Sequence, residues 1–412
     1  MKAPKILVIG TLMLIGEFIF LLPFVVTRIF RPTFLTVFDI NNLQLGSAFS
    51  VYGIVAMISY FAGGPLADRF PPRKLLPISF LATAAAGFVM ATIPSIWTLT
   101  LLYGLWGMST ILLFWASYVK AQREFGGKFS QGKSYGSVDA GRGLVAALMA
   151  SASIFLLDAL LPVSADDATK EHLTHALSWI IIIFSFLTAI GALLVWLFLD
   201  KDTFKKGNMP HLSLKGVKSV IQKPEVWLQA IIVLCAYVGY KCTDDFSLYA
   251  KDTFNYNDVN AAHMATVSFW MRPAAALAAG FIGDRLVHSR VISICFALML
   301  AGSLVISAGF LKMGMEGIII VTIASTSAGI YGLRGLYFTL FQEANLPIVF
   351  TGSAAGLVSV IGYTPDVFMG PLMGVVLDSN PGPTGHQYLF IILAGFSVIG
   401  FITSVIFRRI SK

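Results

Sequence analysis

Two stretches of this chain repeat one pattern, G-x-x-[AG]-D-R. The first is GGPLADRFPPRKLL at residues 63–76, and the second is AGFIGDRLVHSRVI at residues 279–292. The acidic residues of the two copies, Asp68 and Asp284, are separated by about half of the 412 residues. An internal repeat at this spacing indicates a chain built from two related halves.

Long apolar runs surround both copies of the pattern. Of the whole chain, 57% is hydrophobic and 12% is charged, whereas soluble domains carry roughly 25% charged residues. A membrane core about 30 Å thick is crossed by roughly 20 apolar residues in a helix. Because the runs are continuous rather than alternating in polarity, they predict an all-α membrane protein. The twelve predicted transmembrane helices are 6–30, 45–67, 74–93, 97–119, 137–160, 174–199, 224–250, 260–283, 290–311, 316–341, 352–377 and 386–408.

The Lys and Arg residues indicate how these spans are oriented. Twenty of them fall on the side of the N-terminus and five on the other side, which predicts a multi-pass protein of the cell inner membrane with both termini cytoplasmic. The orientation of the spans thus accounts for the net charge of +8, and no nucleic-acid partner is needed to explain it. The polar stretch 200–223 predicts a cytoplasmic linker between two pseudo-symmetric six-helix bundles, at 1–199 and 224–412.

The repeated pattern has the composition of a gating loop. Glycine lets helix ends pack closely, and aspartate can accept hydrogen bonds from neighbouring helix termini. Arginine can pair with carboxylates at the cytoplasmic face. Such contacts would lock one conformation and release in another, whereas the alternative is a plain, positively charged turn. The candidate gating residues are Gly64, Asp68, Arg69, Arg73, Gly280, Asp284, Arg285 and Arg290.

These motifs resemble the signature loop of the major facilitator superfamily. The match is close at Asp68, Arg69 and Arg73, whereas the second copy has Val287 and His288 where more basic residues are often seen. The resemblance implies two six-helix bundles around a central cavity that works by alternating access. It also implies that spans one, four, seven and ten line this cavity, with two, five, eight and eleven beside them.

Three further stretches suggest a branch of that family. Residues 43–80 look like bacterial glycerol-phosphate and sugar-phosphate transporters, and residues 136–150 and 351–378 look similar to sugar-acid and sulfosugar transporters. The phosphate-ester transporters of this branch rely on paired arginines from spans one and seven. Here Arg28 is near the outer end of span one and span seven offers Lys241, which is a point charge rather than a fork. This difference argues against an organophosphate substrate, whereas a carboxylate or sulfonate is compatible with it.

Several basic residues fall inside the predicted spans, where a charge costs about 2.5–3.5 kcal/mol. Some have a carboxylate within one helical turn: Arg142 follows Asp139, and Lys241 precedes Asp244 and Asp245. These groups either form internal ion pairs or bind an anion. Arg272 and Arg334 have no such neighbour, so we expect them to face the cavity. The alternative is a partner on another helix. The candidate substrate-binding residues are Arg28, Arg142, Lys241, Arg272, Arg334, Tyr240 and Tyr337.

Carboxylates within the spans are candidates for proton coupling, because burial favours the protonated form. Glu17 is the first candidate, followed by Asp245 and Asp366. The alternative for Glu17 is a salt bridge to a basic residue of another span. The phosphate-binding pattern GxxxxGK[ST] occurs at residues 127–134, but there it lies between two predicted transmembrane helices rather than between a strand and a helix. A proton gradient rather than ATP is therefore the expected energy source.

The sequence therefore predicts a secondary active transporter of a small organic anion, acting as a proton symporter. The alternative is a proton-antiport exporter of drugs or metabolites, including siderophore-like compounds. We find no enzyme constellation, metal site or cofactor site, and the Cys and His spacings suggest none. Protons and membrane lipid are the other expected partners, and one chain is expected to function as a monomer. The substrate and the direction of transport stay open.

Overall fold

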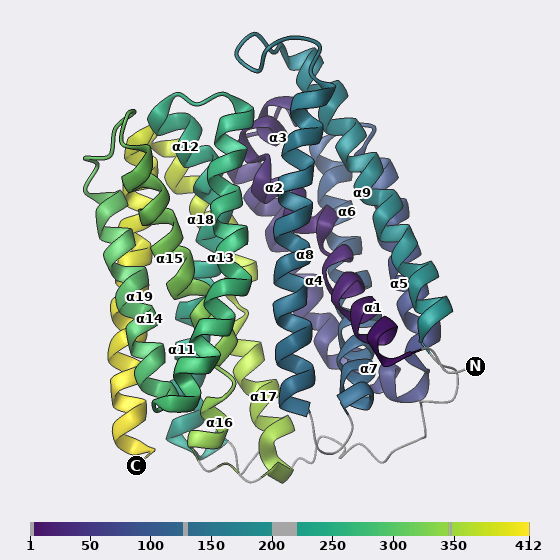
Figure 1. Cartoon of the computed structure of the whole chain (residues 1–412), viewed down its shortest axis with the longest axis vertical. Helices are drawn as coiled ribbons and strands as arrows, with labels where there is room; N and C mark the ends of the chain where they lie inside the picture. Colours follow the sequence, from purple (N-terminus) through teal and green to yellow (C-terminus); the bar gives the residue numbers. More distant parts are fainter. Residues whose placement is uncertain (1–3, 127–130, 200–220, 345, 347, 412) are drawn as a thin grey trace.

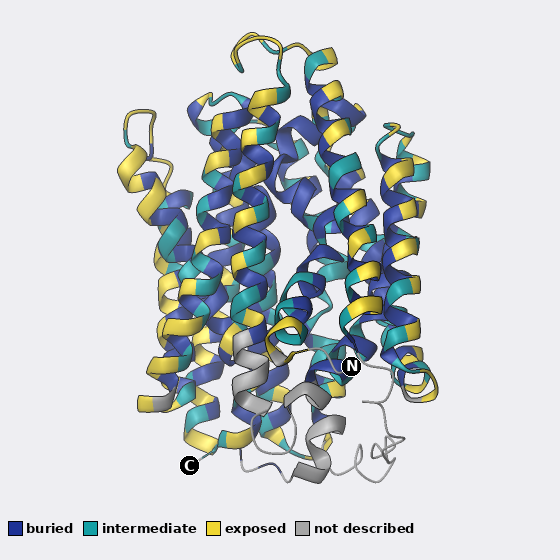
Figure 2. Ribbon diagram, turned by 45° about the vertical axis from the view of Figure 1, so that its right-hand side comes forward, coloured by how far each residue is buried: buried dark blue, intermediate teal, exposed yellow. Residues whose placement is uncertain are grey.

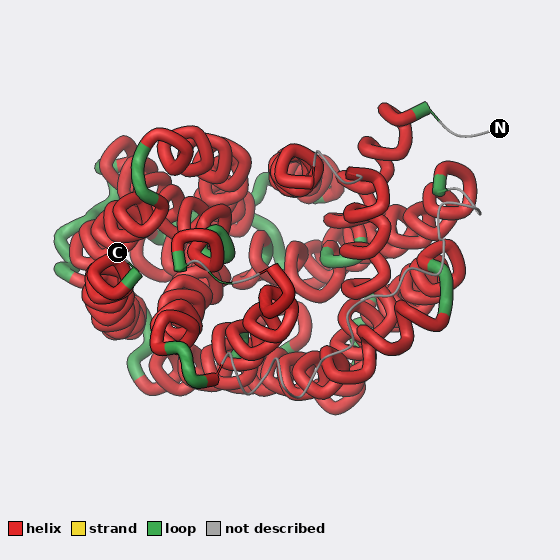
Figure 3. Tube along the Cα trace, turned by 90° about the horizontal axis from the view of Figure 1, so that it is seen from below, coloured by secondary structure: helices red, strands yellow, loops and turns green. Residues whose placement is uncertain are grey.

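The computed structural model describes residues 4–126, 131–199, 221–344, 346 and 348–411. Seen end-on, this part of the chain consists of helices and loops, and it contains no strand (Figure 3). The elements of the first half lie on one side of the molecule and those of the second half on the other (Figure 1).

The first half of the chain forms the elements that carry the first six spans. They are α1 (Lys5–Phe18), η1 (Leu21–Val25), α2 (Val26–Ile29), α3 (Arg31–Phe38), α4 (Asn42–Arg69), α5 (Pro72–Met90), α6 (Ile96–Gly107), η2 (Met108–Trp115), α7 (Ala116–Gly126), α8 (Gln131–Leu160) and α9 (Lys170–Phe198). Here η1 and η2 are π-helical segments within longer helices.

The second half forms a comparable set of elements. They are α11 (Pro224–Cys242), η3 (Thr243–Asp245), α12 (Phe246–Phe254), α13 (Asp258–Arg285), α14 (His288–Ser307), α15 (Glu316–Leu336), α16 (Leu340–Glu343), α17 (Ile348–Gly362), α18 (Pro365–Ser379) and α19 (Pro383–Ile410). The segment η3 is a single turn of 3-10 helix.

The described residues contain eleven helices long and apolar enough to cross a membrane, and a bent pair at Ile6–Phe18 and Leu21–Ile29 makes twelve. This confirms the predicted all-α membrane protein. Exposed residues lie along the outer sides of the helices and buried ones along their inner sides (Figure 2). Many of the exposed side chains are large and apolar, including Phe61, Phe155 and Phe281. A surface of this kind suits contact with lipid.

Several of the predicted spans depart from a regular α-helix. The first bends by 42° at a π-helical turn that contains Pro23, because proline removes a backbone donor and π-turns distort the helix. The seventh span contains the 3-10 turn of η3, which places Asp244 and Asp245 at a break. The eleventh is divided where α18 begins at Pro365. The hydrophobicity of these runs predicts the spans but not their breaks.

Each half has its own hydrophobic core. The first core is built from α1 to α9 with three residues of α13, and the second from α11 to α19. Residues 200–220 of the predicted linker lie outside the described residues. The division of the chain into bundles at 1–199 and 224–412 therefore stays a proposal.

The halves meet along two helix pairs, α4 with α18 and α8 with α13. Along the first pair, a Cβ on Gly46 would collide with the backbone of Gly370. Along the second, a Cβ on Gly143 would lie 3.1 Å from the backbone nitrogen of Pro273. Small residues thus let these helices approach to backbone contact.

Polar contacts join the halves at one end of the molecule. We call the end where α1 begins and α19 ends the terminal face, and the other end the opposite face (Figure 1). At the opposite face, Asp378 of α18 accepts hydrogen bonds from the backbone N–H of Asn42 (3.1 Å) and of Leu43 (2.8 Å). These N–H groups are the free donors at the N-terminus of α4, where a negative charge is stabilising.

Two more hydrogen bonds join the halves at the opposite face. Thr33 donates to Asp258 at 2.7 Å, and Asn257 donates to Asp166 at 2.7 Å. The hydrogen bonds found between the halves of the described chain lie at mid-depth or toward this face. The structure is therefore closed at the opposite face.

Candidate substrate cavity

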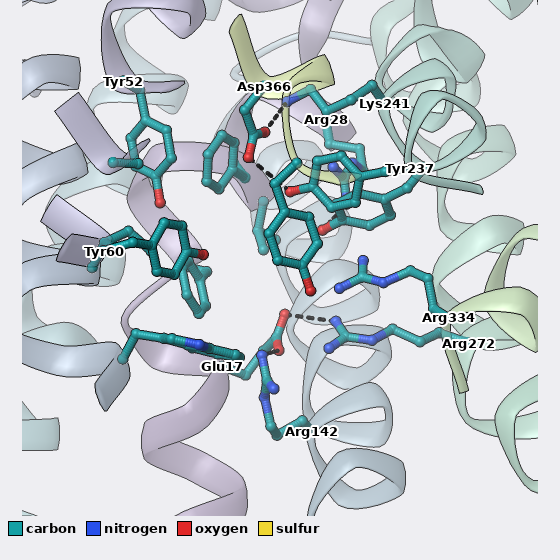
Figure 4. A pocket seen from close by; sticks show the side chains of 18 residues that line it. Glu17, Arg28, Tyr52, Tyr60, Arg142, Tyr237, Lys241, Arg272, Arg334 and Asp366 are labelled. Carbon is teal, nitrogen blue, oxygen red and sulfur yellow. Dashed lines mark hydrogen bonds and ion pairs between the residues drawn. The ribbon is translucent and has the colours of Figure 1, made fainter. Parts of the chain in front are cut away.

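A cavity of about 90 Å³ lies between the two halves. Its wall includes side chains from α1, η1, α2, α4, η2 and α8 of the first half and from α11, α13, α15 and α18 of the second (Figure 4). Five basic and two acidic side chains point into this apolar and aromatic frame. They are Arg28, Arg142, Lys241, Arg272, Arg334, Glu17 and Asp366.

Glu17 occupies the middle of the cavity and contacts two arginines. Its Oε1 accepts a hydrogen bond from Nη1 of Arg272 at 3.0 Å, and its Oε2 lies 3.7 Å from Nη2 of Arg142. Arg142 also lies 3.4 Å from Asp139. Since Glu17 and Arg272 belong to different halves, this ion pair crosses the cavity. The structure thus shows the salt bridge from Glu17 to a basic residue of another span, which the sequence analysis gave as the alternative to proton coupling.

A second group of charges lies nearer the opposite face. Arg28 donates to Asp244, and Lys241 lies 3.5 Å from Asp244 and 3.6 Å from Asp366. The Tyr237 hydroxyl donates to Asp366 at 3.0 Å. Arg28 and Lys241 are almost fully buried, so their charges need these carboxylates as partners. We call these five residues the Lys241 cluster.

Arg334 differs from the other cations of the wall. Its guanidinium lies 3.7 Å from the ring centroid of Tyr240, in a cation–π contact. It makes no ion pair with any described residue, and its Nη1 is buried there without a hydrogen-bond partner. Figure 4 shows the guanidinium pointing into the cavity beside that of Arg272. The site can therefore accept an additional negative group at this point.

In addition to the fold and the paired charges of the cavity, the sequence itself matches a known family. A family model described as the Major Facilitator Superfamily matches residues 9–364. The chain belongs to the Major Facilitator Superfamily.

Curated relatives of this superfamily member match almost its full length. The inner membrane protein YqcE of Escherichia coli is 26% identical over 386 residues, which cover 90% of this chain and 87% of that protein. The inner membrane protein YihN of Escherichia coli is 24% identical, with 91% and 89% covered.

Solved structures share the superfamily fold at low identity. A bacterial homologue of the human lysosomal transporter Spinster, inward-facing and unoccupied, has a TM-score of 0.71 at 14% identity, with 98% of this chain and 97% of that chain covered. The nucleoside transporter NupG has a TM-score of 0.70 at 15% identity, with 99% and 98% covered. The E. coli fucose:proton symporter FucP has a TM-score of 0.59 at 18% identity, with 97% and 98% covered.

The structure brings most of the predicted site residues together. The five basic residues, Tyr240, Glu17 and Asp366 all line the cavity. Tyr337 lies behind the wall, where its hydroxyl is 3.3 Å from that of Tyr363. Asp245 lies away from the cavity, against His386. Whether any of these residues binds substrate or a proton stays a proposal.

Sequence reasoning missed several features of the cavity. Arg272 has no carboxylate within one turn of its own helix but pairs with Glu17 across the cavity. His386, the first residue of the predicted span 386–408, was not among the candidate site residues, and it is buried in the first turn of α19. Tyr60 lines the cavity with Tyr52 and Ala56, and their spacing of four along α4 is the signal that could have found it.

The two predicted gating loops are tight turns at the terminal face, between α4 and α5 and between α13 and α14. The expected close packing at Gly64 and Gly280 is wrong, because a Cβ at either would meet nothing within 4 Å. Arg73 donates to the backbone carbonyl of Trp196 at 2.6 Å rather than to a carboxylate. The side chains of Asp68 and Asp284 lie outside the described part, and the gating role stays a proposal.

Proposed function

We propose that this protein is a secondary active transporter that moves a small organic anion across the inner membrane by alternating access, together with a proton. The favoured substrates are carboxylates, sulfonates and sugar acids. The observation that carries this proposal is Arg334, a cation that faces the cavity without an ion pair in the described chain. A cation held in a low-dielectric cavity is stabilised by an anionic ligand, which supplies the missing partner.

The balance of charge in the wall supports an anionic substrate. Five cations and two carboxylates line the cavity, and the carboxylates are already engaged by Arg142, Arg272 and Lys241. A cationic substrate would meet this excess of positive charge. Arg334 and Arg272 present forked guanidinium groups, which match the two oxygens of a carboxylate or sulfonate.

The size and polarity of the cavity support a small, hydroxylated compound. A cavity of about 90 Å³ has room for roughly six to nine water-sized positions. Tyrosine hydroxyls from both halves line it, from Tyr52, Tyr60, Tyr237, Tyr240 and Tyr363. These groups can donate to and accept from the hydroxyls of a sugar acid.

Competition at Glu17 supplies a mechanism for proton coupling. An anion bound to Arg272 and Arg334 would displace the Glu17 carboxylate from its hydrogen bond with Arg272. A carboxylate that loses this partner in a buried site takes up a proton more readily. Anion binding and proton binding at Glu17 would therefore favour each other. The solved fucose:proton symporter has the same fold.

The surface charges and the closed face support a cavity that opens toward the cytoplasm. The excess of Lys and Arg on the side of the termini supports cytoplasmic termini. The opposite face, closed by Asp378 and Asn42, would then be periplasmic. In this conformation the cavity would exchange substrate with the cytoplasm.

A thermal-unfolding screen of the purified protein in detergent tests the substrate class. The probes are D-gluconate, D-glucuronate, 2-hydroxyethanesulfonate, glucose 6-phosphate, uridine, L-fucose and tetraphenylphosphonium. A probe at 100 times its Kd should stabilise the protein by about 2.7 kcal/mol. We expect a sugar acid or the sulfonate to do so. Stabilisation by tetraphenylphosphonium alone, or by the neutral probes alone, would contradict the proposal.

Arg334→Gln should weaken binding of the anion about 10- to 100-fold, because it removes one charge-assisted contact worth about 1.5–3 kcal/mol. Lys312→Gln is the matched control, since Lys312 is an exposed cation in the loop between α14 and α15. Equal binding by wild type and Arg334→Gln would remove Arg334 from the site.

A further inference from the structure

Three titratable side chains form a continuous chain near the opposite face. The carboxylate of Asp252 in α12 lies 3.2 Å from Nε2 of His386, and Nδ1 of His386 lies 2.7 Å from the carboxylate of Asp245 in η3. The side chain of Asp252 is 33% exposed, whereas those of His386 and Asp245 are fully buried. The chain thus runs from a solvated carboxylate to a buried one.

The number of protons on this chain is not fixed by its hydrogen bonds. A neutral imidazole has one donor nitrogen, yet both nitrogens of His386 face carboxylate oxygens. Both contacts are satisfied when the imidazole carries two protons, or when one carboxyl group is protonated and donates to it. The remaining oxygen of Asp245, Oδ1, is buried without a hydrogen-bond partner in the described chain. A buried charged acceptor left in this state is costly, and this cost falls when the carboxyl group of Asp245 takes up a proton.

A second cavity connects this chain with the opposite face. Its volume is about 710 Å³, and its wall includes Asp252 and His386. Asn42 and Asp378, the residues that join the halves at this face, are part of the same wall. Solvent in this cavity therefore reaches the exposed end of the proton chain.

The buried end of the chain lies next to the Lys241 cluster. Asp245 directly follows Asp244 in the 3-10 turn of η3, and Asp244 contacts Arg28 and Lys241 in the wall of the substrate cavity. The carboxylate that holds these two cations thus belongs to the residue next to Asp245, and a change in the charge of Asp245 takes place beside it. Such proximity couples the two sites electrostatically, because charges separated by a few ångströms in a low-dielectric region interact strongly.

We propose that Asp252, His386 and Asp245 form a proton-binding site that is loaded from the opposite face. This inference rests on the proposed function, to which it adds a proton-binding site beside that at Glu17. Protonation of this site neutralises the negative charge of Asp245 beside Asp244. The positive charges of Arg28 and Lys241 are then less fully compensated. The substrate cavity then attracts an anion more strongly, and by linkage a bound anion favours the proton.

Proton transfer along the chain is balanced. A hydronium ion in the second cavity gives its proton to the carboxylate of Asp252 and becomes water. His386 starts as a neutral imidazole with its proton on Nδ1. Asp252 passes the new proton to the unprotonated Nε2 of His386, while Nδ1 releases its own proton to Oδ2 of Asp245. One proton enters, the imidazole keeps its charge, and Asp245 becomes neutral.

Other titratable and charged groups face this site from the neighbouring elements. The ring of Tyr249 in α12 lies 5.5 Å from that of His386, and the thiol of Cys242 in α11 interacts with Asp245. Lys251 and Asp378 line the second cavity with Asp252. Lys251 is held by Asp258 at 2.8 Å, and Asp378 is held by the N-terminus of α4.

The test uses right-side-out membrane vesicles and labelled D-gluconate, the sugar-acid probe of the screen above. Two quantities are measured: exchange of labelled for unlabelled gluconate at equal pH, and net accumulation as the external pH is lowered by one unit. With one coupled proton, accumulation by wild type should rise by about tenfold per pH unit. His386→Gln and Asp252→Asn should keep exchange but lose most of this rise. His175→Gln, which changes an exposed histidine near the start of α9, should behave as wild type.

The two proposals fail in different ways. If both variants keep the tenfold response, the inference is overturned while the anion transporter stands. If wild type exchanges no gluconate, the proposed sugar-acid transport fails and this inference with it. If His386→Gln also loses exchange, Asp252→Asn decides, since the side chain of Asp252 is partly exposed. Loss of the tenfold pH response in Asp252→Asn supports the inference. A wild-type pH response in Asp252→Asn overturns it.

Discussion

At the scale of single residues, the cavity is organised by how each buried charge is paired. Sequence alone marks these residues, because charges inside apolar runs are costly and rare. It cannot predict their partners when these lie on other helices. Arg272 and Glu17 are 255 residues apart and form an ion pair, and Arg28 reaches Asp244 over 216 residues. Arg142 and Asp139, three residues apart, form the kind of contact that helical spacing can predict.

Glu17→Gln should raise the affinity of the protein for an anion and weaken the dependence of this affinity on pH. The neutral amide competes less well for Arg272, so the guanidinium is freed for substrate. We expect about a tenfold gain in affinity, equivalent to about 1.4 kcal/mol. The measurement is the Kd for D-gluconate over a range of pH by isothermal calorimetry. A weaker Kd with the wild-type pH response would show that Glu17 only stabilises the fold.

At the scale of elements, the contact between α4 and α18 closes the opposite face. The capping box of Asn41 and Gln44 predicts where α4 begins, but nothing local in the sequence shows that Asp378 binds this helix end from the other half. Breaks within spans are equally hard to predict. Pro365 indicates the start of α18, whereas the 3-10 turn at Thr243–Asp245 contains neither glycine nor proline.

Gly46→Val should shift the protein away from the closed state seen here. The added side chain would collide with the backbone of Gly370, and overpacking of this kind costs about 1–3 kcal/mol. Cysteines placed at Asp166 and Asn257, which touch across the opposite face, should then cross-link more slowly with a short bifunctional thiol reagent.

Gly395→Val is the control for this prediction, because a Cβ at Gly395 in α19 meets nothing within 4 Å. It carries the same change of residue type within a helix. Equal cross-linking rates in Gly46→Val and Gly395→Val would show that close contact at Gly46 does not hold the opposite face closed.

At the scale of the whole molecule, the two halves enclose a cavity to which each contributes charges. The repeated G-x-x-[AG]-D-R pattern and the apolar runs predict the fold and its family, because hydrophobic length and internal repeats are written directly in the sequence. The resemblance to the superfamily also predicts which spans line the cavity. The position of Asp245 away from it, beside His386, depends on how α19 packs against α12, and the sequence pattern carries no signal for that contact.

The central claim is that the cavity carries an organic anion, and Arg334 is the residue on which it depends most. The most direct measurement is counterflow of labelled D-gluconate into liposomes that contain the purified protein and unlabelled gluconate. The account predicts saturable counterflow by wild type and Lys312→Gln, with a rate lowered at least about tenfold in Arg334→Gln at subsaturating substrate. Counterflow of tetraphenylphosphonium or uridine instead, unaffected by Arg334→Gln, would contradict it.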